Sequence, residues 1–431
     1  MIDKMRMLKI AKEGYWIIIG QVFSIVGSLY FIKLITNKLE PSLYGTVSLV
    51  LSISTFFGQV IYGGVGSAVS RFYSIAENQI DLRRYFDSSR KIIFKLSSFL
   101  LLFGGITAIL LLIMGYPNLF FLTIFTLLIS ILNGVISVLN CFQNAARQRI
   151  LVSLNNGLGI VFKIGISLLL FNLFGANETS LIISLLLASS ITLFLQLIFL
   201  RKNWKSKLQI YNSSQSAFNW HNQIWTYSLS VILWNGFMAL YQLSDKWALE
   251  YNNSSKEVGV YTVFFQLGYS SILLVITNLL AFLSPIIYQR AGDGKDQVKN
   301  NYVDSTITKL ILLTFSFSVV GFFITYRFHK EILSYLVGEN YLHYSYLLPG
   351  FVLSACIFAA GQILNLKMES QIKVKEMNFV KISTSIVGMG LNFVLSALYG
   401  INGLLVALLI YSISFFLGML KISRTHFILN I

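Results

Sequence analysis

A lone lysine in a long apolar stretch is the residue whose setting most strongly suggests chemistry. The segment LGIVFKIGISLLLF, residues 158–171, is apolar except for Lys163, and no carboxylate occurs within ten residues on either side of it. A lysine at the centre of a membrane-spanning helix costs about 2.5–3.5 kcal/mol on insertion scales. Binding an anion would offset that cost. A structural role, in which the ammonium bonds backbone carbonyls at a helix break, is the alternative.

Three more cations lie toward the ends of predicted spans. Lys33 is near the outer end of the first span, and Arg71 is at the inner end of the second. Lys246 is the counterpart of Lys33 in the second half of the chain. With Lys163 they form a set able to bind an anion. The alternative is that these three side chains extend to the lipid head groups.

Other kinds of reactive site find no support in the sequence. It contains no Ser-His-Asp set, no metal-ligand spacing and no G-x-x-x-x-G-K-[ST] nucleotide loop. Cys141 and Cys356 both fall inside apolar runs, where small packing residues are expected. The sequence therefore predicts a protein that is not an enzyme and has no cofactor or metal.

The composition is that of an integral membrane protein. Of the 431 residues 55% are hydrophobic and 12% are charged, against about 25% charged in soluble domains, and the mean hydropathy is +0.71. A spanning helix needs roughly 20 mostly apolar residues, and continuous apolar runs without alternation predict helices. Twelve spans are predicted, at 13–36, 44–70, 92–114, 118–143, 151–174, 179–200, 223–249, 258–288, 307–327, 344–366, 379–398 and 402–420.

Basic residues alternate between the two sides of these spans. Twenty-six of the 33 lysines and arginines fall on the side of the N-terminus, six fall on the other side, and Lys163 lies between them. By the positive-inside rule, both termini are predicted to be cytoplasmic. The net charge of +16 is then an orientation signal and a contact with anionic membrane lipid. Nucleic acid is not a predicted partner.

The chain divides into two halves of six spans. The predicted parts are an N-terminal lobe (1–200), a cytoplasmic linker loop (201–222) and a C-terminal lobe (223–431). PSLYGTVSLVLSI (41–53) aligns with SKEVGVYTVFFQL (255–267), which places Gly45 on Gly259. Such a parallel repeat is typical of rocking, alternating-access transporters with a substrate site between the halves.

Segments spread over nearly the whole chain resemble one family. KLEPSLYGTVSLVLSISTFFGQVIYGGVGSAVSRFYS (38–74) has a P-x-x-Y-G turn followed by an apolar helix, as in polysaccharide repeat-unit (O-antigen, Wzx-type) flippases. These belong to the multidrug/oligosaccharidyl-lipid/polysaccharide exporter superfamily. Three later segments are similar to further elements of the family: SDKWALEYNNSSKEVGVYTVFFQLG (244–268), AFLSPIIYQR (281–290) and LNFVLSALYGINGLLVALLIYSIS (391–414).

The resemblance implies an all-α fold of twelve transmembrane helices in two six-helix bundles, V-shaped and MATE-like, with a central cavity. It implies a flippase of the bacterial cytoplasmic (inner) membrane, in which alternating access carries undecaprenyl-pyrophosphate-linked O-antigen or capsular/exopolysaccharide repeat units to the outer leaflet. The four cations would then contact the pyrophosphate. A polysaccharide polymerase is a further candidate partner.

Uncharged polar stripes are consistent with a cavity that binds sugars, because amides bond hydroxyls and aromatic rings stack on pyranose faces. The alternative is that these side chains bond neighbouring helices, at about 0.6 kcal/mol per contact. The candidates are Gln21, Ser24 and Ser28 in the first span, Trp234, Asn235, Tyr241 and Gln242 in the seventh, and Gln266 in the eighth.

Asp245 is the only acidic residue close to the centre of a span or the mouth of a cavity. Buried carboxylates that exchange a proton or sodium ion are usual in cation-coupled transporters, so Asp245 is the hypothesis for ion coupling. Two other functions remain open. One is a cation-coupled multidrug exporter of the same superfamily, which the lysines disfavour because its substrates are often cationic. The other is a non-transporting scaffold of a glycan assembly complex.

Overall fold

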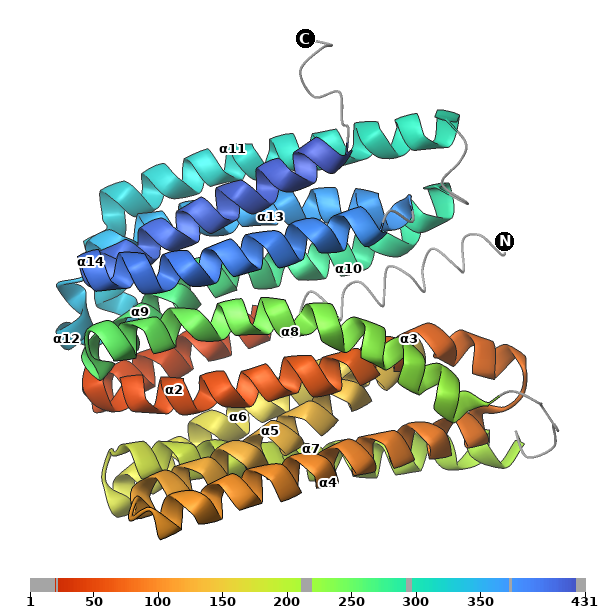
Figure 1. Ribbon diagram of the computed structural model, residues 1–431, viewed down its shortest axis with the longest axis horizontal. Coiled ribbons are helices and arrows are strands. Elements are labelled where there is room, and N and C mark those ends of the chain that lie inside the picture. The colour runs from red at the N-terminus through yellow and green to blue at the C-terminus, as the bar shows by residue number, and fades with distance from the viewer. Residues whose placement is uncertain (1–19, 21, 211–218, 292–296, 372–373, 424–431) are drawn as a thin grey trace. The chain divides into compact units, whose positions relative to one another are not determined.

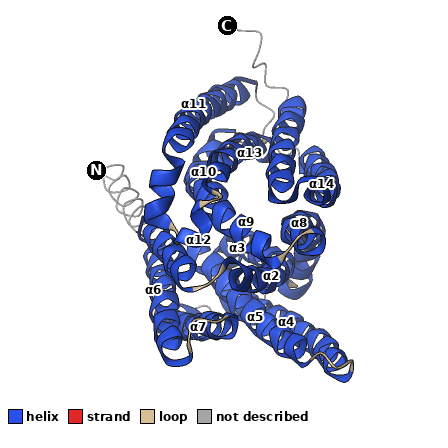
Figure 2. Cartoon of the chain, turned by 90° about the vertical axis from the view of Figure 1, so that its left-hand side faces the viewer, coloured by secondary structure: helices blue, strands red, loops and turns tan. Residues whose placement is uncertain are grey.

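A computed structural model describes residues 20, 22–210, 219–291, 297–371 and 374–423, which form helices and short connections (Figure 2). The first helices are 22–38, α2 (Pro41–Phe57), the π-helix η1 (Gly58–Tyr62), α3 (Gly63–Asn78), α4 (Leu82–Ile113), α5 (Pro117–Ala145), α6 (Arg149–Phe174) and α7 (Glu178–Ile210). They continue with α8 (Trp220–Asn252), α9 (Ser255–Phe264), the π-helix η2 (Phe265–Ser270), α10 (Ser271–Ala291), α11 (Gln297–Leu336), α12 (Glu339–Leu342), the 3-10 helix η3 (Ser345–Leu347), α13 (Leu348–Ser370) and α14 (Val374–Ser423).

The prediction of a multi-pass, all-helical membrane protein is confirmed. Nine helices within the described residues are long and apolar enough to cross a membrane. The last of these contains Gly400 at φ +55°, which divides α14 into two limbs, 374–399 and 401–423. Gly400 falls between the predicted spans 379–398 and 402–420. The exact count of twelve spans stays a prediction.

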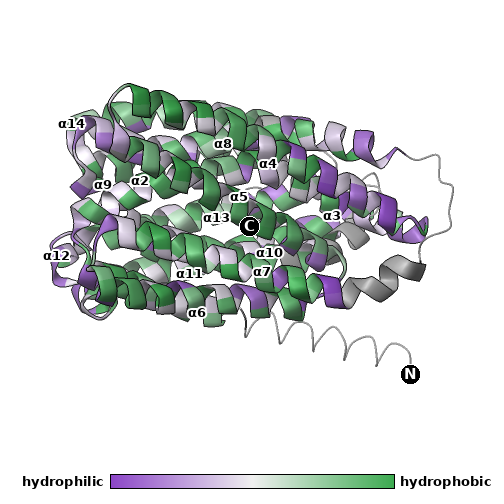
Figure 3. Ribbon diagram, turned by 90° about the horizontal axis from the view of Figure 1, so that it is seen from below, coloured by the Kyte–Doolittle hydropathy of each residue, from purple (hydrophilic) through white to green (hydrophobic). Residues whose placement is uncertain are grey.

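Several helices are longer than the apolar runs that predicted them. Residues 201–210, expected in a cytoplasmic loop, instead continue α7 to Ile210. α11 begins ten residues before its predicted span and runs to Leu336 across a non-helical residue at Phe328. Hydropathy detects only the part of a helix inside hydrocarbon, whereas polar turns continue the helix beyond it. In Figure 3 hydrophilic residues accordingly gather near the helix ends.

The chain forms two compact units whose limits fall inside helices. One comprises the described residues up to Phe31 together with 49–239, and the other comprises 32–48 with the described residues from 240 onward. Helix 22–38, α2 and α8 each contribute to both units. These limits differ from the predicted division at 201–222. The assignment of six spans to each lobe stays a prediction.

Each unit has its own buried interior. In the first, aromatic residues at one end of α3, α4 and α5 pack around Tyr85, which lies edge-on to the Trp220 ring at 5.4 Å between centroids. The Trp220 indole donates to the carboxylate of Asp81 at 2.7 Å, which fixes the start of α8. In the second unit α13 is the most buried span, with 78% of its most apolar window buried, and it packs against α10, α11 and α14 (Figure 1).

Paired glycines let α2 and α9 cross within the second unit. A Cβ added at Gly45 would overlap the carbonyl oxygen of Ser255, and one added at Gly259 would overlap that of Pro41. The two contacts are equivalent. Ser255 is four residues before Gly259, and Pro41 is four residues before Gly45. The residues matched in the sequence repeat therefore also meet in space.

This crossing makes a prediction for stability. Gly45→Ala forces backbone apart, and overpacking of this kind costs about 1–3 kcal/mol. The matched control is Gly165→Ala in α6, where no atom lies within 4 Å of the added Cβ. We expect thermal unfolding in detergent to show a lower Tm for Gly45→Ala and an unchanged or higher Tm for the control. Equal melting of the two variants would contradict the close approach.

Candidate functional site

Lys163 lies in the middle of α6, in the first unit, and its side chain is half-buried. Its ammonium has no hydrogen-bond or ion-pair partner among the residues that the structure describes. On the N-terminal side of Lys163, α6 packs against helix 22–38, where Gly27 contacts Ile160. Lys163 lies about one turn beyond that contact. The described part of the protein thus provides no counter-charge for it.

A chain of hydrogen-bonded amides joins α5, α6 and α7, on the side of α6 that carries Lys163. The Gln196 Nε2 donates to Asn140 Oδ1 at 2.8 Å and to Gln143 Oε1 at 3.0 Å. Asn140 Nδ2 in turn donates to Asn156 Oδ1 at 3.2 Å. Asn156 precedes Lys163 by seven residues, about two helical turns, so both lie on one face of α6. These four amide side chains, which we call the amide strip, therefore lead along α6 toward Lys163.

One member of this region has unused hydrogen-bonding capacity. Asn155 is 1% exposed, and neither atom of its amide has a partner among the described residues. The Gln196 Oε1 is also without one. An unpaired polar group in a buried place costs about 1–3 kcal/mol, so these atoms would gain from bound water or a bound hydroxyl.

The amide strip was missed in the sequence, although a signal exists there. Asn133 and Asn140 are seven residues apart on α5, and Ser189 and Gln196 are seven apart on α7. The Ser189 hydroxyl donates to Asn133 Oδ1 at 3.0 Å, so the two pairs face each other. Matching polar spacings on two adjacent spans would have indicated the contact.

Asp245 is buried in the second unit, with 7% of its surface exposed. Its carboxylate accepts the Tyr261 hydroxyl at 3.0 Å and the backbone N–H of Lys246 at 2.6 Å. One turn earlier on α8, Tyr241 is 6% exposed and stacks on Tyr411 at 3.8 Å between ring centroids. Tyr241 thus packs within the protein, and the described partners of the Asp245 carboxylate are one tyrosine hydroxyl and one backbone N–H.

The remaining predicted site residues are dispersed. Lys33 and Lys246 are half-buried in the second unit, Arg71 is exposed on α3, Ser24 is half-buried and Ser28 is exposed. Asn235 Nδ2 donates to the Gln59 carbonyl of η1 at 3.5 Å, Gln266 accepts the Tyr44 hydroxyl at 3.2 Å, and Gln242 is exposed. Gln21 and the side chain of Trp234 lie outside the described residues. No contact joins Lys163 to another of these candidates within the described part of the chain.

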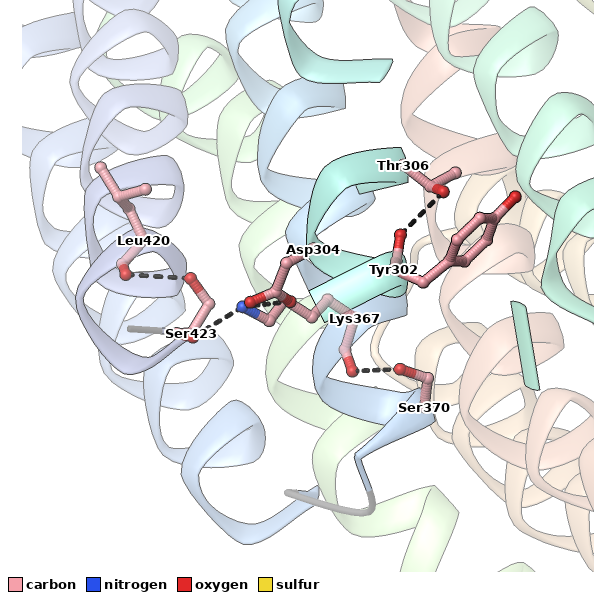
Figure 4. Close-up of polar contacts among 7 residues, drawn as sticks. All are labelled: Tyr302, Asp304, Thr306, Lys367, Ser370, Leu420 and Ser423. Atoms are coloured by element: carbon pink, nitrogen blue, oxygen red, sulfur yellow. Dashed lines mark hydrogen bonds and ion pairs between the residues drawn. The ribbon is translucent and has the colours of Figure 1, made fainter. Parts of the chain in front are cut away.

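Lys367, near the end of α13, is a buried cation and one of the 26 basic residues predicted on the side of the N-terminus. It is 1% exposed. Its ammonium lies 2.8 Å from Asp304 Oδ1 of α11 and donates to the Ser423 carbonyl, at the end of α14, at 3.0 Å. Figure 4 shows these contacts joining three helices. Lys367 therefore fixes helix ends.

The fold is that of a known class of membrane transporters. The chain is similar to a structure described as lipid II flippase MurJ in an inward closed conformation, with TM-score 0.69, 14% identity, and 95% of this chain and 87% of that chain covered. It is also similar to the Vibrio cholerae MATE transporter VcmN (TM-score 0.61, 13% identity, 97% and 98% covered) and to an inward-facing multidrug resistance MATE transporter of the MOP superfamily (0.61, 15%, 94% and 94%). At these identities the likeness shows the fold alone.

The family is shown by sequence. Residues 10–290 match the family described as polysaccharide biosynthesis protein, and the chain belongs to that family. No curated protein matches the chain. The predicted resemblance to proteins of polysaccharide biosynthesis is thereby confirmed at the level of this family, and the fold is shared with structures of the exporter superfamily. The particular glycan and the roles of the individual residues stay proposals.

The Lys367 contacts can be tested by removing the charge. Lys367→Met keeps the apolar stem but leaves Asp304 and the Ser423 carbonyl without their donor, which we expect to cost about 1–3 kcal/mol. Thermal unfolding in detergent should show a lower Tm. Lys375→Met, at an exposed lysine of α14, is the matched control and should melt like the wild type. A Tm for Lys367→Met equal to that of the control would show that the buried contacts contribute nothing.

Proposed function

We propose that this protein flips undecaprenyl-pyrophosphate-linked oligosaccharide repeat units, of the O-antigen or capsular/exopolysaccharide kind, from the cytoplasmic to the outer leaflet by alternating access. Family membership supports glycan biosynthesis as the setting, and the transporter fold supports movement across the membrane. The proposed setting is a bacterial cytoplasmic membrane with both termini inside. A polysaccharide polymerase is the proposed further partner.

Lys163 is the observation that carries the proposal. The same fold supplies Lys367 with a carboxylate and a carbonyl, yet supplies Lys163 with no described partner. A lysine in a span needs compensation, and a pyrophosphate is a multiply charged anion that must pass this depth. Their attraction is stronger in a low-dielectric setting than in water. The proposed role of Lys163 is thus to contact the pyrophosphate during passage.

The amide strip of α5, α6 and α7 supports the carbohydrate part of the substrate. Amides both donate and accept, as sugar hydroxyls require, and Asn156 of this strip is exposed and shares a face of α6 with Lys163. The alternative of a multidrug exporter draws on the likeness to MATE transporters and on Asp245. A cationic drug would be repelled by Lys163, whereas an anionic lipid-linked sugar would be attracted.

The first test removes the ammonium. In a host strain that depends on this protein for surface glycan, Lys163→Gln should lower glycan display about tenfold or more, because charge-assisted hydrogen bonds contribute about 1.5–3 kcal/mol. Lys163→Arg should restore part of the display. Immunoblots of membranes should show normal accumulation of both variants.

Lys330→Gln is the matched control, since this lysine is exposed and lies outside the proposed site. It should leave glycan display unchanged. Full display with Lys163→Gln would remove the proposal. Such a result would favour a scaffold, which needs no charge at that depth.

Asp245 carries the proposal for ion coupling. Asp245→Asn keeps an acceptor for the Tyr261 hydroxyl but removes the exchangeable charge. In vesicles that contain lipid-linked glycan, we expect wild-type transport to fall when the proton and sodium gradients are collapsed, and transport by the variant to be low and insensitive to them. Asp87→Asn, at an exposed residue of α4, should behave like the wild type. Wild-type transport indifferent to both gradients would refute coupling through Asp245.

A further inference from the structure

A groove runs between the two limbs of α14. Its volume is about 790 Å³, within the range of about 300–1,000 Å³ typical of ligand pockets. Each limb contributes three lining residues at positions i, i+4 and i+7, which share one face of a helix. They are Glu376, Val380 and Ser383 on the first limb, and Ser414, Gly418 and Lys421 on the second.

The limbs run antiparallel, which gives the groove a charged end and a neutral end. Gly418 faces Val380 so closely that an added Cβ would lie 2.7 Å from Val380 Cγ1, so the limbs are in contact along the middle of the groove. Glu376 and Lys421 consequently lie at one end, and the serines lie at the other. Seven residues of helix separate the ends, a length of about 10 Å.

The groove is expected to face the acyl chains of the membrane. All of its lining residues belong to α14. Phe379, on the rim, is 72% exposed, and Val387 and Val394 continue the face of Val380 at seven-residue steps with 58% and 56% exposure. We expect these exposed apolar side chains to contact lipid.

The two charges at the end of the groove are available to a ligand. Glu376 and Lys421 are both exposed, and neither forms an ion pair or hydrogen bond with another described residue. Lys421 is in the last turn of α14 and Glu376 in the first, so both are expected at the membrane surface. One ammonium and one carboxylate side by side complement a head group that itself carries one negative and one positive charge.

We propose that this groove binds one molecule of a zwitterionic phospholipid with a primary ammonium, phosphatidylethanolamine. The Lys421 ammonium bonds the phosphate, the Glu376 carboxylate accepts from the lipid ammonium, and the glycerol and upper acyl chain lie along the groove toward Ser383 and Ser414. A singly anionic lipid would leave Glu376 without a partner. A choline head group has no N–H to donate.

Native mass spectrometry of the full chain with added phosphatidylethanolamine, phosphatidylglycerol or phosphatidylcholine tests this site. Wild type should retain phosphatidylethanolamine best. Lys421→Gln should weaken its retention about tenfold or more, as expected for loss of one charge-assisted hydrogen bond. Glu376→Gln should weaken retention of phosphatidylethanolamine but not of phosphatidylglycerol.

Matched controls use exposed groups outside the groove. Lys375→Gln and Glu331→Gln should bind lipid like the wild type. Ser414→Phe, which fills the groove, should lose the retained lipid, whereas Leu417→Phe on a lipid-exposed face outside the groove should keep it. The proposal is overturned if the groove variants bind like the controls. Preference for phosphatidylglycerol with no effect of Glu376→Gln would also overturn it, in favour of a simple anionic-lipid contact.

Discussion

Inside hydrocarbon a polar group has no water to bond, so the protein must satisfy it or a ligand must. The same constraint holds for a group buried in protein, and near the end of α13 the second unit meets it for Lys367, whose ammonium is held between Asp304 and the Ser423 carbonyl. The first unit does not meet it for Lys163 within the described residues. Two lysines at helical positions therefore have opposite meanings. The paired one fixes the ends of three helices, and the unpaired one is the charge that the proposed function assigns to the substrate.

A feature could be predicted from the sequence when its signal lies in residues that are neighbours along the chain. Lys163 stands out because its neighbours along the chain are apolar, and the all-helical, multi-span fold follows from continuous apolar runs. The role of Lys367 could not be read, because its partner Asp304 is 63 residues earlier and on another helix. The helical continuation of α7 over 201–210 was likewise hidden, since polar residues beyond the bilayer carry no hydropathy signal.

The repeat and the polar stripes show a second limit. Gly45 and Gly259 were matched by weak sequence similarity, and their contact in space gives a physical reason for both to be glycine. Tyr241 had been assigned with polar neighbours to a sugar-binding stripe, yet its ring stacks on Tyr411 in the interior. Spacing along one helix identifies a face, but only the neighbouring helices decide whether that face meets a cavity or another side chain.

The division into units bears on how alternating access could operate. Because helix 22–38, α2 and α8 contribute to both units, any motion of one unit against the other must be absorbed inside continuous helices. α8 has Gly236, with no atom within 4 Å of an added Cβ, three residues before its boundary at Ala239. The π-helix η1 follows α2, where the hydrogen-bond ladder is already interrupted. Such irregular turns bend at lower cost than regular helix, and of the two only Gly236 lies close to a limit between the units.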